Sequence, residues 1–184
     1  LFGNNPIDAC RSAITQCYKY YGINKTAARE RRQLNRTIPD QIVEGRNFIA
    51  NNIKKVENPV PDQAKSRIEY EYPMICVREI IANALAHRDY EVDHRFVHIT
   101  LFSDRIEVKS PGNWFGKPLD NEKSYKLEDL ESSSIKRNIA LSDVLSWILL
   151  VEGEGSGIPT AVEDCKKMDA PIPNVVQMEE YVKV

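Results

Sequence analysis

The segment that most constrains the fold runs from Pro73 to His87 and reads "PMICVREIIANALAH". On a helical wheel four of its apolar residues gather on one side: Val77, Ile81, Ala84 and Leu85. Glu79, Asn83 and His87 follow one another at four-residue spacing and fall within about 80° of arc on the opposite side. The pattern predicts a helix that covers an apolar layer with one side and presents polar side chains on the other.

Strands are predicted around this helix, because apolar and polar residues partly alternate in several short segments. The expected strands are 11–21, 29–38, 67–72, 95–102, 105–110 and the tail 175–184. Further helices are expected from Thr37 to about Lys55, with Thr37 or Asp40 as the cap and Pro39 in the first turn, and at 139–151 and 158–168. Residues 56–66 form a Pro-rich break, and residues 113–137 are polar without a clear period, which predicts a long mobile loop.

The composition is that of an ordinary globular protein, with 42% hydrophobic and 28% charged residues. No apolar run approaches the roughly 18 residues of a membrane helix. The four cysteines are scattered without a C-x-x-C pair, which favours a reduced, intracellular setting over a zinc or redox motif. The first residues, "LFGNNP", resemble the interior of a longer sequence, so the chain is expected to be a fragment.

Charge is unevenly distributed along the chain. The net charge is −2, yet residues 1–36 hold seven Lys or Arg against two Asp or Glu, so they carry +5 and the remainder carries −7. The candidates for contacts with a nucleic-acid backbone are Lys19, Lys25, Arg29, Arg31, Arg32 and Arg36. The alternative is a solvated strand or loop.

A glycine-rich loop, residues 153–157, directly precedes a predicted helix. Backbone N–H groups in such a loop can turn toward a phosphate, and the helix N-terminus adds partial positive charge. The spacing is neither that of a P-loop nor that of a Rossmann fingerprint, and a purely structural role for the glycines is the alternative.

A kinase catalytic loop and a zinc site are also considered for the histidines, and both are rejected. His87-Arg88-Asp89 lacks the asparagine of the kinase catalytic loop, since position 94 is His. His87, His94 and His98 match no zinc spacing, so we expect them to be hydrogen-bonded structural residues.

The Glu79 and Asn83 pair fits a different chemistry. A carboxylate can accept a proton from water, while an amide oxygen one turn away can coordinate Mg²⁺, which keeps several waters and takes substrate phosphates as its other ligands. A polar face exposed to solvent is the alternative.

Three motifs occur in order: "E-x-x-x-N-A-x-x-H-R-D-Y" from Glu79, "D-R-I-E-V-x-S-P-G" from Asp104 and "E-G-x-G-S-G-I" from Glu152. Together with "R-N-I" at Arg137, they resemble the ATP-binding domain of RecG-like transcriptional regulators. That domain is a short relative of the gyrase, heat-shock chaperone, histidine kinase and mismatch-repair ATPases (GHKL, or Bergerat fold). The resemblance covers about residues 67–184, and the first two motifs are highly specific. Residues 1–55 are similar to the end of a Schlafen/Alba-type DNA-binding domain and its linker helix.

The resemblance implies roles for the motif residues. Glu79 would activate the attacking water and Asn83 would bind Mg²⁺ between the nucleotide phosphates. The remaining nucleotide-binding residues would be His87, Arg88 and Asp89 at the helix end, Ser110, Pro111 and Gly112 on the adenine side, and Arg137, Gly153, Gly155, Ser156 and Gly157 around the phosphates. The loop 113–137 would be a lid whose cations reach toward the phosphates: Lys117, Lys123, Lys126, Lys136 and Arg137.

The implied fold class is α+β: a two-layer α/β sandwich of GHKL type with a mainly antiparallel mixed sheet, preceded by a partial α/β DNA-binding domain. The implied limits are 1–38 for the C-terminal part of the Schlafen/Alba-type domain, 39–66 for the linker helix and Pro-rich connection, and 67–184 for the ATP-binding domain. ATP and Mg²⁺ are the implied cofactors, DNA the implied partner and the cytoplasm the implied location. A homodimer is compatible with this picture, and no membrane is involved.

The chain departs from the family at two places. The superfamily's D-x-G-x-G box has an aspartate that binds the adenine amino group, whereas the corresponding turn here is Ser110-Pro111-Gly112, and "R-N-I" replaces the more common "R-N-P". The motifs of a translocating helicase are not in the sequence. Two functions stay open: an ATP-binding, slowly hydrolysing regulatory domain of a DNA-binding transcriptional regulator, and a nucleotide-free regulatory or dimerisation module.

Overall fold

A mixed sheet forms one layer of the molecule. The computed structural model describes residues 10–59, 66–116, 118–130, 135–148, 150 and 155–184. Within these residues, seven strands pair in the order β2-β1-β5-β6-β9-β8-β7. Their bounds are β1 Thr15–Tyr20, β2 Arg29–Leu34, β5 Val97–Leu101, β6 Ile106–Pro111, β7 Ser124–Lys126, β8 Asn174–Gln177 and β9 Tyr181–Lys183. All neighbours are antiparallel except β1 and β5, which run parallel.

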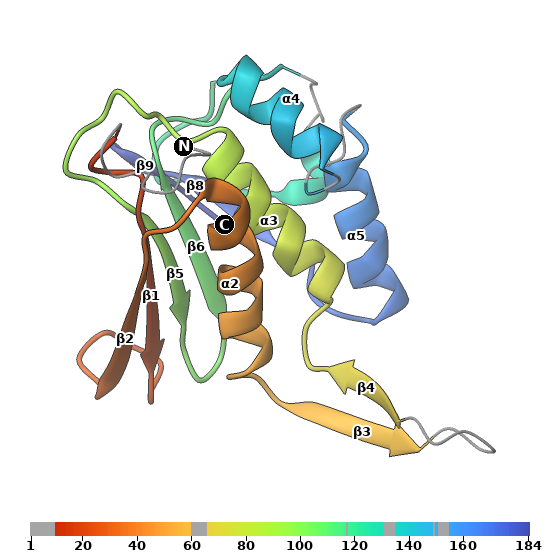
Figure 1. Ribbon diagram of the computed structural model, residues 1–184. Helices are drawn as coiled ribbons and strands as arrows, with labels where there is room; N and C mark the ends of the chain where they lie inside the picture. Colours follow the sequence, from red (N-terminus) through yellow and green to blue (C-terminus); the bar gives the residue numbers. More distant parts are fainter. Residues whose placement is uncertain (1–9, 60–65, 117, 131–134, 149, 151–154) are drawn as a thin grey trace.

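Helices form the second layer, on one side of the sheet (Figure 1). They are α2 (Ile38–Ala50), α3 (Met74–Ala86), α4 (Ile139–Trp147) and α5 (Gly157–Lys167), with a short 3-10 helix, η1, at Leu127–Asp129. The expected α+β sandwich with a mainly antiparallel sheet is therefore confirmed. None of the helices in the described part of the chain is long and apolar enough to cross a membrane.

Helix α2 begins as its sequence predicts. The Thr37 side chain accepts a hydrogen bond from the backbone N–H of Asp40 at 3.3 Å, and Pro39 lies in the first turn, where its missing N–H is harmless. The helix ends at Ala50, earlier than the expected Lys55, and a turn leads from it to a strand that begins at Lys55. A Cβ on Gly45 would lie 2.7 Å from Ile99 Cδ1, so glycine lets the helix approach strand β5 closely.

The main core lies between the sheet and helices α2, α3 and α4. Its fully buried side chains include Ile38, Ile42, Ile49, Ile81, Leu85, Val97, Ile99 and Leu145. Burying one such aliphatic side chain stabilises the fold by roughly 1.5–3 kcal/mol, so this cluster fixes the position of α3 over β5 and β6.

Two expectations about the middle of the chain are corrected. The segment read as a Pro-rich break contains β3 (Lys55–Pro59), which pairs with β4 (Ser66–Tyr70) in a hairpin extending away from the body (Figure 1). The segment 113–137, read as a loop without regular structure, contributes β7 and η1. There Leu127 and Leu130 are buried against Val162 of α5, because their apolar side chains complete a second, smaller cluster.

The C-terminal tail is also different from the expected single strand. It folds into the hairpin β8–β9, closed by a hydrogen bond from Met178 N to Tyr181 O at 2.7 Å. The expected limits of the domains stay a prediction. Strands β1 and β2, assigned above to a preceding domain, pair into the same sheet as β5 and β6.

Burial separates the four cysteines into two reactivity classes. Cys17, Cys76 and Cys165 are buried free thiols, whereas Cys10 is half-buried. Burial raises the pKa of Cys17 from 9.0 to about 12 and also raises the pKa of Cys76 and of Cys165. Since the thiolate is the reactive form, labelling of the buried Cys17 in the native state should be much slower than labelling of an accessible thiol.

We therefore expect a thiol reagent such as DTNB at pH 8 to label one cysteine rapidly in the native protein and four in denaturant. The control Cys10→Ser should lose the rapid phase alone. Rapid labelling of two or more thiols in the native protein would contradict the burial described above.

Candidate functional site

Helix α3 places Glu79 and Asn83 side by side, as the four-residue spacing predicts. The Asn83 amide Nδ2 donates a hydrogen bond to Glu79 Oε1 at 2.8 Å. Glu79 is only 4% exposed, although carboxylates are rarely buried without a specific role or partner. The amide nitrogen of Asn83 makes this hydrogen bond, so its amide oxygen takes no part in it.

The N-terminus of α5 closes over the Glu79 carboxylate. A Cβ added at Gly157 would overlap Glu79 Oε1 and would lie 2.5 Å from Cδ, so only glycine fits there. Gly155, just before the helix, has a φ of 76°, a conformation that glycine adopts without strain. Because a helix N-terminus carries partial positive charge, it stabilises the buried carboxylate beneath it. The expected phosphate-binding glycine loop is thus in direct contact with the expected base.

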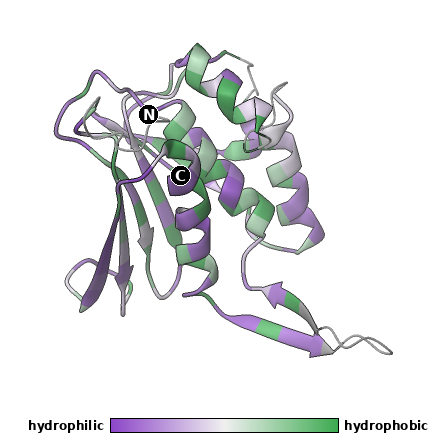
Figure 2. Ribbon diagram, viewed as in Figure 1, coloured by the Kyte–Doolittle hydropathy of each residue, from purple (hydrophilic) through white to green (hydrophobic). Residues whose placement is uncertain are grey.

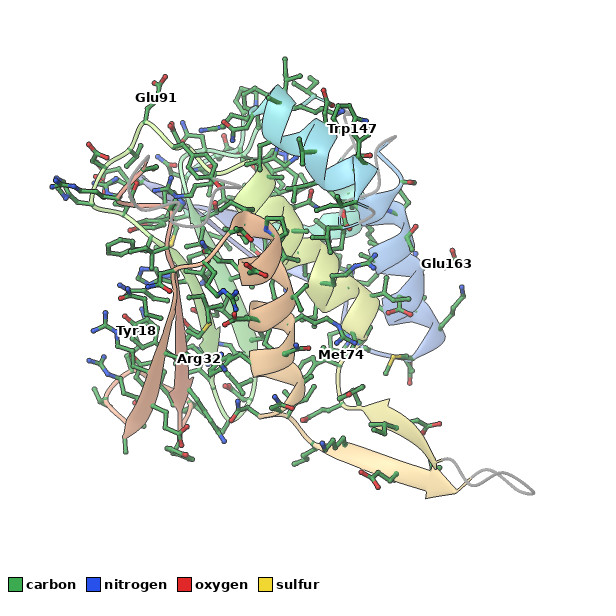
Figure 3. All side chains as sticks on the ribbon, viewed as in Figure 1. Tyr18, Arg32, Met74, Glu91, Trp147 and Glu163 are labelled. Atoms are coloured by element: carbon green, nitrogen blue, oxygen red, sulfur yellow. The ribbon has the colours of Figure 1, made fainter. Side chains whose placement is uncertain are left out.

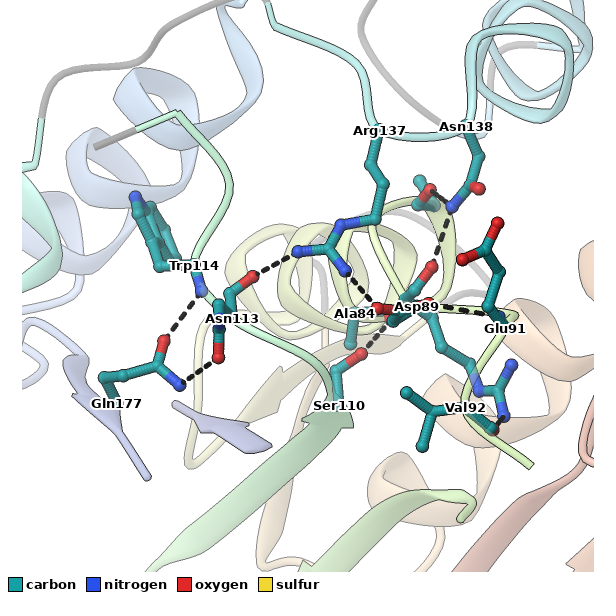
Figure 4. Close-up of polar contacts among 12 residues, drawn as sticks. Ala84, Asp89, Glu91, Val92, Ser110, Asn113, Trp114, Arg137, Asn138 and Gln177 are labelled. Carbon is teal, nitrogen blue, oxygen red and sulfur yellow. Dashed lines mark hydrogen bonds and ion pairs between the residues drawn. The ribbon is translucent and has the colours of Figure 1, made fainter. Parts of the chain in front are cut away.

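A second group of predicted residues meets at the far end of α3, where β6 ends (Figure 4). Arg137 Nη1 forms an ion pair with Asp89 at 3.1 Å, and its Nη2 donates to the backbone oxygen of Asn113 at 2.8 Å. Gly112 has a φ of 103°, and a Cβ there would lie 2.7 Å from Arg137 Nη1. The turn after β6 therefore needs glycine both for its backbone conformation and for the close approach of Arg137.

His87 lies beside this group. Its ring stacks on Phe115 with 6.5 Å between centroids, and the Arg137 guanidinium lies 5.0 Å from the centre of the same ring. Burial lowers the pKa of His87, and the positive charge of Arg137 lowers it further, so the imidazole is neutral at pH 7. A neutral ring can stack and accept a hydrogen bond, but it adds no charge for holding a phosphate.

Ser110 and Asn138 tie the end of α3 to its surroundings. The Ser110 hydroxyl donates to the backbone oxygen of Ala84 at 2.6 Å, and Asn138 Nδ2 donates to the backbone oxygens of Ala86 and Arg88, both at 2.8 Å. The bonds to Ala84 and Ala86 satisfy carbonyls that the end of α3 leaves without partners. Asn138 was not predicted as a site residue, and the signal for it was its place in the "R-N-I" motif.

Arg88 is held by the loop that follows α3. It is 1% exposed, donates to the backbone oxygens of Val92 and Arg95 at 3.3 and 2.7 Å, and lies 4.6 Å from the centre of the Tyr90 ring. Its place is in the loop after α3. Pro111, by contrast, lies next to the predicted group, because its backbone oxygen accepts from Asp89 N at 3.0 Å.

The cations of the predicted lid are engaged within the protein. Lys123 pairs with Asp120 at 3.3 Å, Lys126 with Glu128 at 3.9 Å and Lys136 with Asp143 at 2.6 Å. Most of these pairs are exposed and contribute little to stability, so they do not prevent the lysines from turning to another anion. Lys117 and Gly153 lie outside the described residues. Ser156 is exposed at the start of α5.

The donor set fits Mg²⁺ only in combination with a phosphate ligand. The described residues contain no group of three or more His, Cys, Asp or Glu side chains placed to hold a metal ion. One amide oxygen beside one carboxylate is nevertheless compatible with Mg²⁺, which is commonly held by one or two protein oxygens, waters and substrate phosphates.

The six basic residues predicted to contact nucleic acid are divided between two sides of the sheet. Arg32 forms an ion pair with Glu44 of α2 at 3.0 Å, and Arg36 lies 3.7 Å from Asp40. Lys19 lies 5.1 Å from the centre of the Tyr21 ring. Arg29 and Arg31 are exposed on the other side, which no helix covers in Figure 1, and Lys25 is exposed in the turn between β1 and β2.

Comparison with known proteins supports part of this picture. The fold is similar to that of the DIP2311 protein from Corynebacterium diphtheriae, with a TM-score of 0.71 and 17% sequence identity, over 92% of this chain and 33% of that one. At this identity the likeness concerns the fold alone, and the chain spans about a third of that structure. No curated protein matches the sequence.

A family match covers the C-terminal part of the chain. Residues 94–184 match the family described as "Putative ATP-dependent DNA helicase recG C-terminal". The matched range includes β5 to β9, α4 and α5, with Gly112, Arg137 and Gly157, but begins after α3. This match supports a RecG-related, ATPase-like domain over residues 94–184.

Proposed function

We propose that this chain is the ATP-binding regulatory domain of a DNA-binding transcriptional regulator, with the nucleotide held between α3 and α5. The observation that carries the proposal is the buried contact between Glu79, Asn83 and Gly157. It joins an amide that can bind Mg²⁺, a glycine-rich helix N-terminus that can face phosphates and a carboxylate that can accept a proton from water. The family match to residues 94–184 supports the same reading. The GHKL type of the fold is part of this proposal.

Each residue has a distinct role in the proposed site. Bound Mg²⁺ would neutralise phosphate charge. Asn83 would bind the metal through its amide oxygen, which takes no part in the hydrogen bond to Glu79, and the backbone N–H groups around Gly155 to Gly157 would face the phosphates. Glu79 would orient a water and accept its proton, so any hydrolysis depends on this residue.

Nucleotide binding would separate two groups that now touch. Glu79 lies against the α5 N-terminus, and a phosphate cannot occupy the same place as the carboxylate. The start of α5 must therefore move away from α3 when phosphates bind. Such a movement is suited to regulation, because it changes the position of a helix in response to a ligand.

The residues on the adenine side of the proposed site lead us to expect a modest affinity for ATP. Ser110 donates to the backbone of α3, and the turn Ser110-Pro111-Gly112 has no carboxylate for the adenine amino group. Losing one buried hydrogen bond costs roughly 1–3 kcal/mol, which is about one to two decades of affinity. A dissociation constant between micromolar and millimolar follows.

The alternative is a nucleotide-free regulatory or dimerisation module. The close Glu79–Gly157 contact favours it, because the carboxylate already occupies the place that a phosphate would take. In this case Glu79 and Asn83 serve only to join α3 to α5.

Calorimetric titration with ATP up to a few millimolar, with and without Mg²⁺, distinguishes the two functions. We expect Mg²⁺-dependent binding that Asn83→Ala weakens at least tenfold, since the metal ligand is lost. The matched control Asn47→Ala, at an exposed position of α2, should bind like the unchanged protein. Absence of binding to all three proteins would eliminate the nucleotide site and leave the alternative.

A further inference from the structure

The side of the sheet that faces away from the helices carries a defined set of aromatic and basic side chains. Residues opposite one another on paired strands, or two apart on one strand, share a face. The register places Tyr18 opposite Arg31, His98 opposite Lys109 and Lys109 opposite Lys183. Tyr181 shares this face with Lys183. We call these six residues the outer face: Tyr18, Arg31, His98, Lys109, Tyr181 and Lys183.

Three rings form a row across the outer face. The centroids of Tyr18 and His98 lie 5.8 Å apart, and those of His98 and Tyr181 lie 6.2 Å apart. All three side chains are half-buried, so each keeps part of its ring accessible while its neighbours hold it in place. The row crosses from β1 over β5 to β9.

Cations surround this row. The Arg29 guanidinium lies 5.6 Å from the centre of the Tyr18 ring, and that of Arg95 lies 5.8 Å from Tyr181. Burial lowers the pKa of His98, and Lys25, Lys109 and Arg31 lower it further. The effect of these three cations on the pKa of His98 indicates that several positive charges lie close together on this side of the sheet.

The carboxylates on this side are already paired with arginines. Glu107 accepts a hydrogen bond from Arg105 at 2.8 Å, and Glu180 forms an ion pair with Arg95. The pKa of Lys109 is lowered overall by burial, Lys25 and Lys183, although the charge of Glu107 partly opposes this. An anion placed over Lys109 would relieve this repulsion.

We propose that the outer face binds single-stranded nucleic acid. Bases stack on the rings of Tyr18, His98 and Tyr181, while the phosphates lie against Lys25, Arg31, Lys109 and Lys183. A sheet that combines exposed rings with basic side chains is a recurring platform for single strands, because every base offers a flat surface for stacking. An acidic peptide would use the charges but not the row of rings, and a duplex keeps its bases inside the stack. The proposal is independent of the nucleotide site, which lies on the helical side.

The structure also supplies a matched control. Arg31 and Arg32 are neighbours in β2, yet they point to opposite sides of the sheet, since Arg32 reaches Glu44 of α2. Figure 3 shows Tyr18 and Arg32 on different sides of strands β1 and β2. Removing Arg31 and Lys109, or Arg32 and Arg36, takes away the same number of positive charges from two different surfaces.

The first test measures fluorescence polarisation of labelled 20-nucleotide oligo-dT, oligo-U and a 20-base-pair duplex at about 50 mM salt. Binding of a single strand should weaken about tenfold in Arg31→Gln/Lys109→Gln and less than threefold in Arg32→Gln/Arg36→Gln. Each phosphate contact to a single strand contributes about −0.7 to the slope of log K against log salt, so the first variant should lose about 1.4 of that slope. Comparing oligo-dT with oligo-U distinguishes DNA from RNA as the ligand.

The second test separates stacking from charge. Tyr18→Leu should weaken binding about tenfold without changing the salt slope, whereas Tyr18→Phe keeps the ring and should bind normally. Thermal melts check that each variant folds. If the Arg31/Lys109 variant does not fold, Lys183→Gln against Arg36→Gln repeats the comparison with single changes. Equal losses in both charge variants, tighter binding of the duplex, or no binding at about 100 µM protein would each overturn the proposal.

Discussion

Replacing Gly157 by alanine is expected to lower the free energy of unfolding by roughly 2–3 kcal/mol, because the new Cβ would overlap the Glu79 carboxylate. Glu79 is 4% exposed and pairs with Asn83, so it cannot turn aside without losing a buried hydrogen bond. For a chain of this size the midpoint of thermal unfolding should fall by about 4–12 °C. Thermal unfolding followed by circular dichroism measures this directly.

The double variant identifies the cause. In a Glu79→Ala background the clashing atoms are gone, so Gly157→Ala should be neutral or should stabilise the protein by up to about 1 kcal/mol, since alanine is favoured over glycine in helices. The effect of the same substitution thus changes sign between the two backgrounds. An equal loss in both would show that the start of α5 resists a Cβ for a reason unrelated to Glu79.

The part of the site that could be predicted from sequence is the part built by local geometry. Glu79 and Asn83 are one helical turn apart, so the helix alone brings their side chains together, and the 2.8 Å hydrogen bond confirms it. The start of α2 at Thr37 was predictable for the same reason, because a cap is decided by residues within one turn.

Contacts between distant segments were not predictable. The sequence marks Gly157 as part of a glycine-rich helix start, but nothing in the motif says that it covers Glu79 of another helix. Arg31 and Arg32 were likewise grouped as equivalent basic residues. Neighbours in any strand face opposite sides, but only the structure reveals that Arg32 is the one that faces the helices.

Strands that depend on a partner were also missed. Strand β3 was concealed by prolines, although its partner β4 was expected, and β7 was concealed by the polar composition of its surroundings, since β3 and β7 are defined by pairing rather than by their own pattern. Strand β2 shows the reverse case. It is mostly hydrophilic (Figure 2) and exposed at five of six positions, which suits the edge of a sheet.

Gln41 is the residue for which we expect the largest single effect on stability. It is 0% exposed, and its side chain joins α2 to the start of β1: Oε1 accepts from the Thr15 hydroxyl at 2.7 Å, and Nε2 donates to the backbone oxygen of Ala13 at 2.9 Å and to that of Arg36 at 2.8 Å. Gln41→Leu keeps a similar volume but leaves these groups without partners. A buried polar group without a partner costs roughly 1–3 kcal/mol.

The bonds to Thr15 and Ala13 are fully buried, whereas the carbonyl of Arg36 is partly accessible to water. The total loss for Gln41→Leu is therefore roughly 3–4 kcal/mol, equivalent to about 10 °C in the unfolding midpoint. The control Gln33→Leu, on exposed strand β2, should stay within about 0.5 kcal/mol. A loss below about 1 kcal/mol for Gln41→Leu would show that water replaces the amide, and that apolar packing alone holds α2 against the sheet.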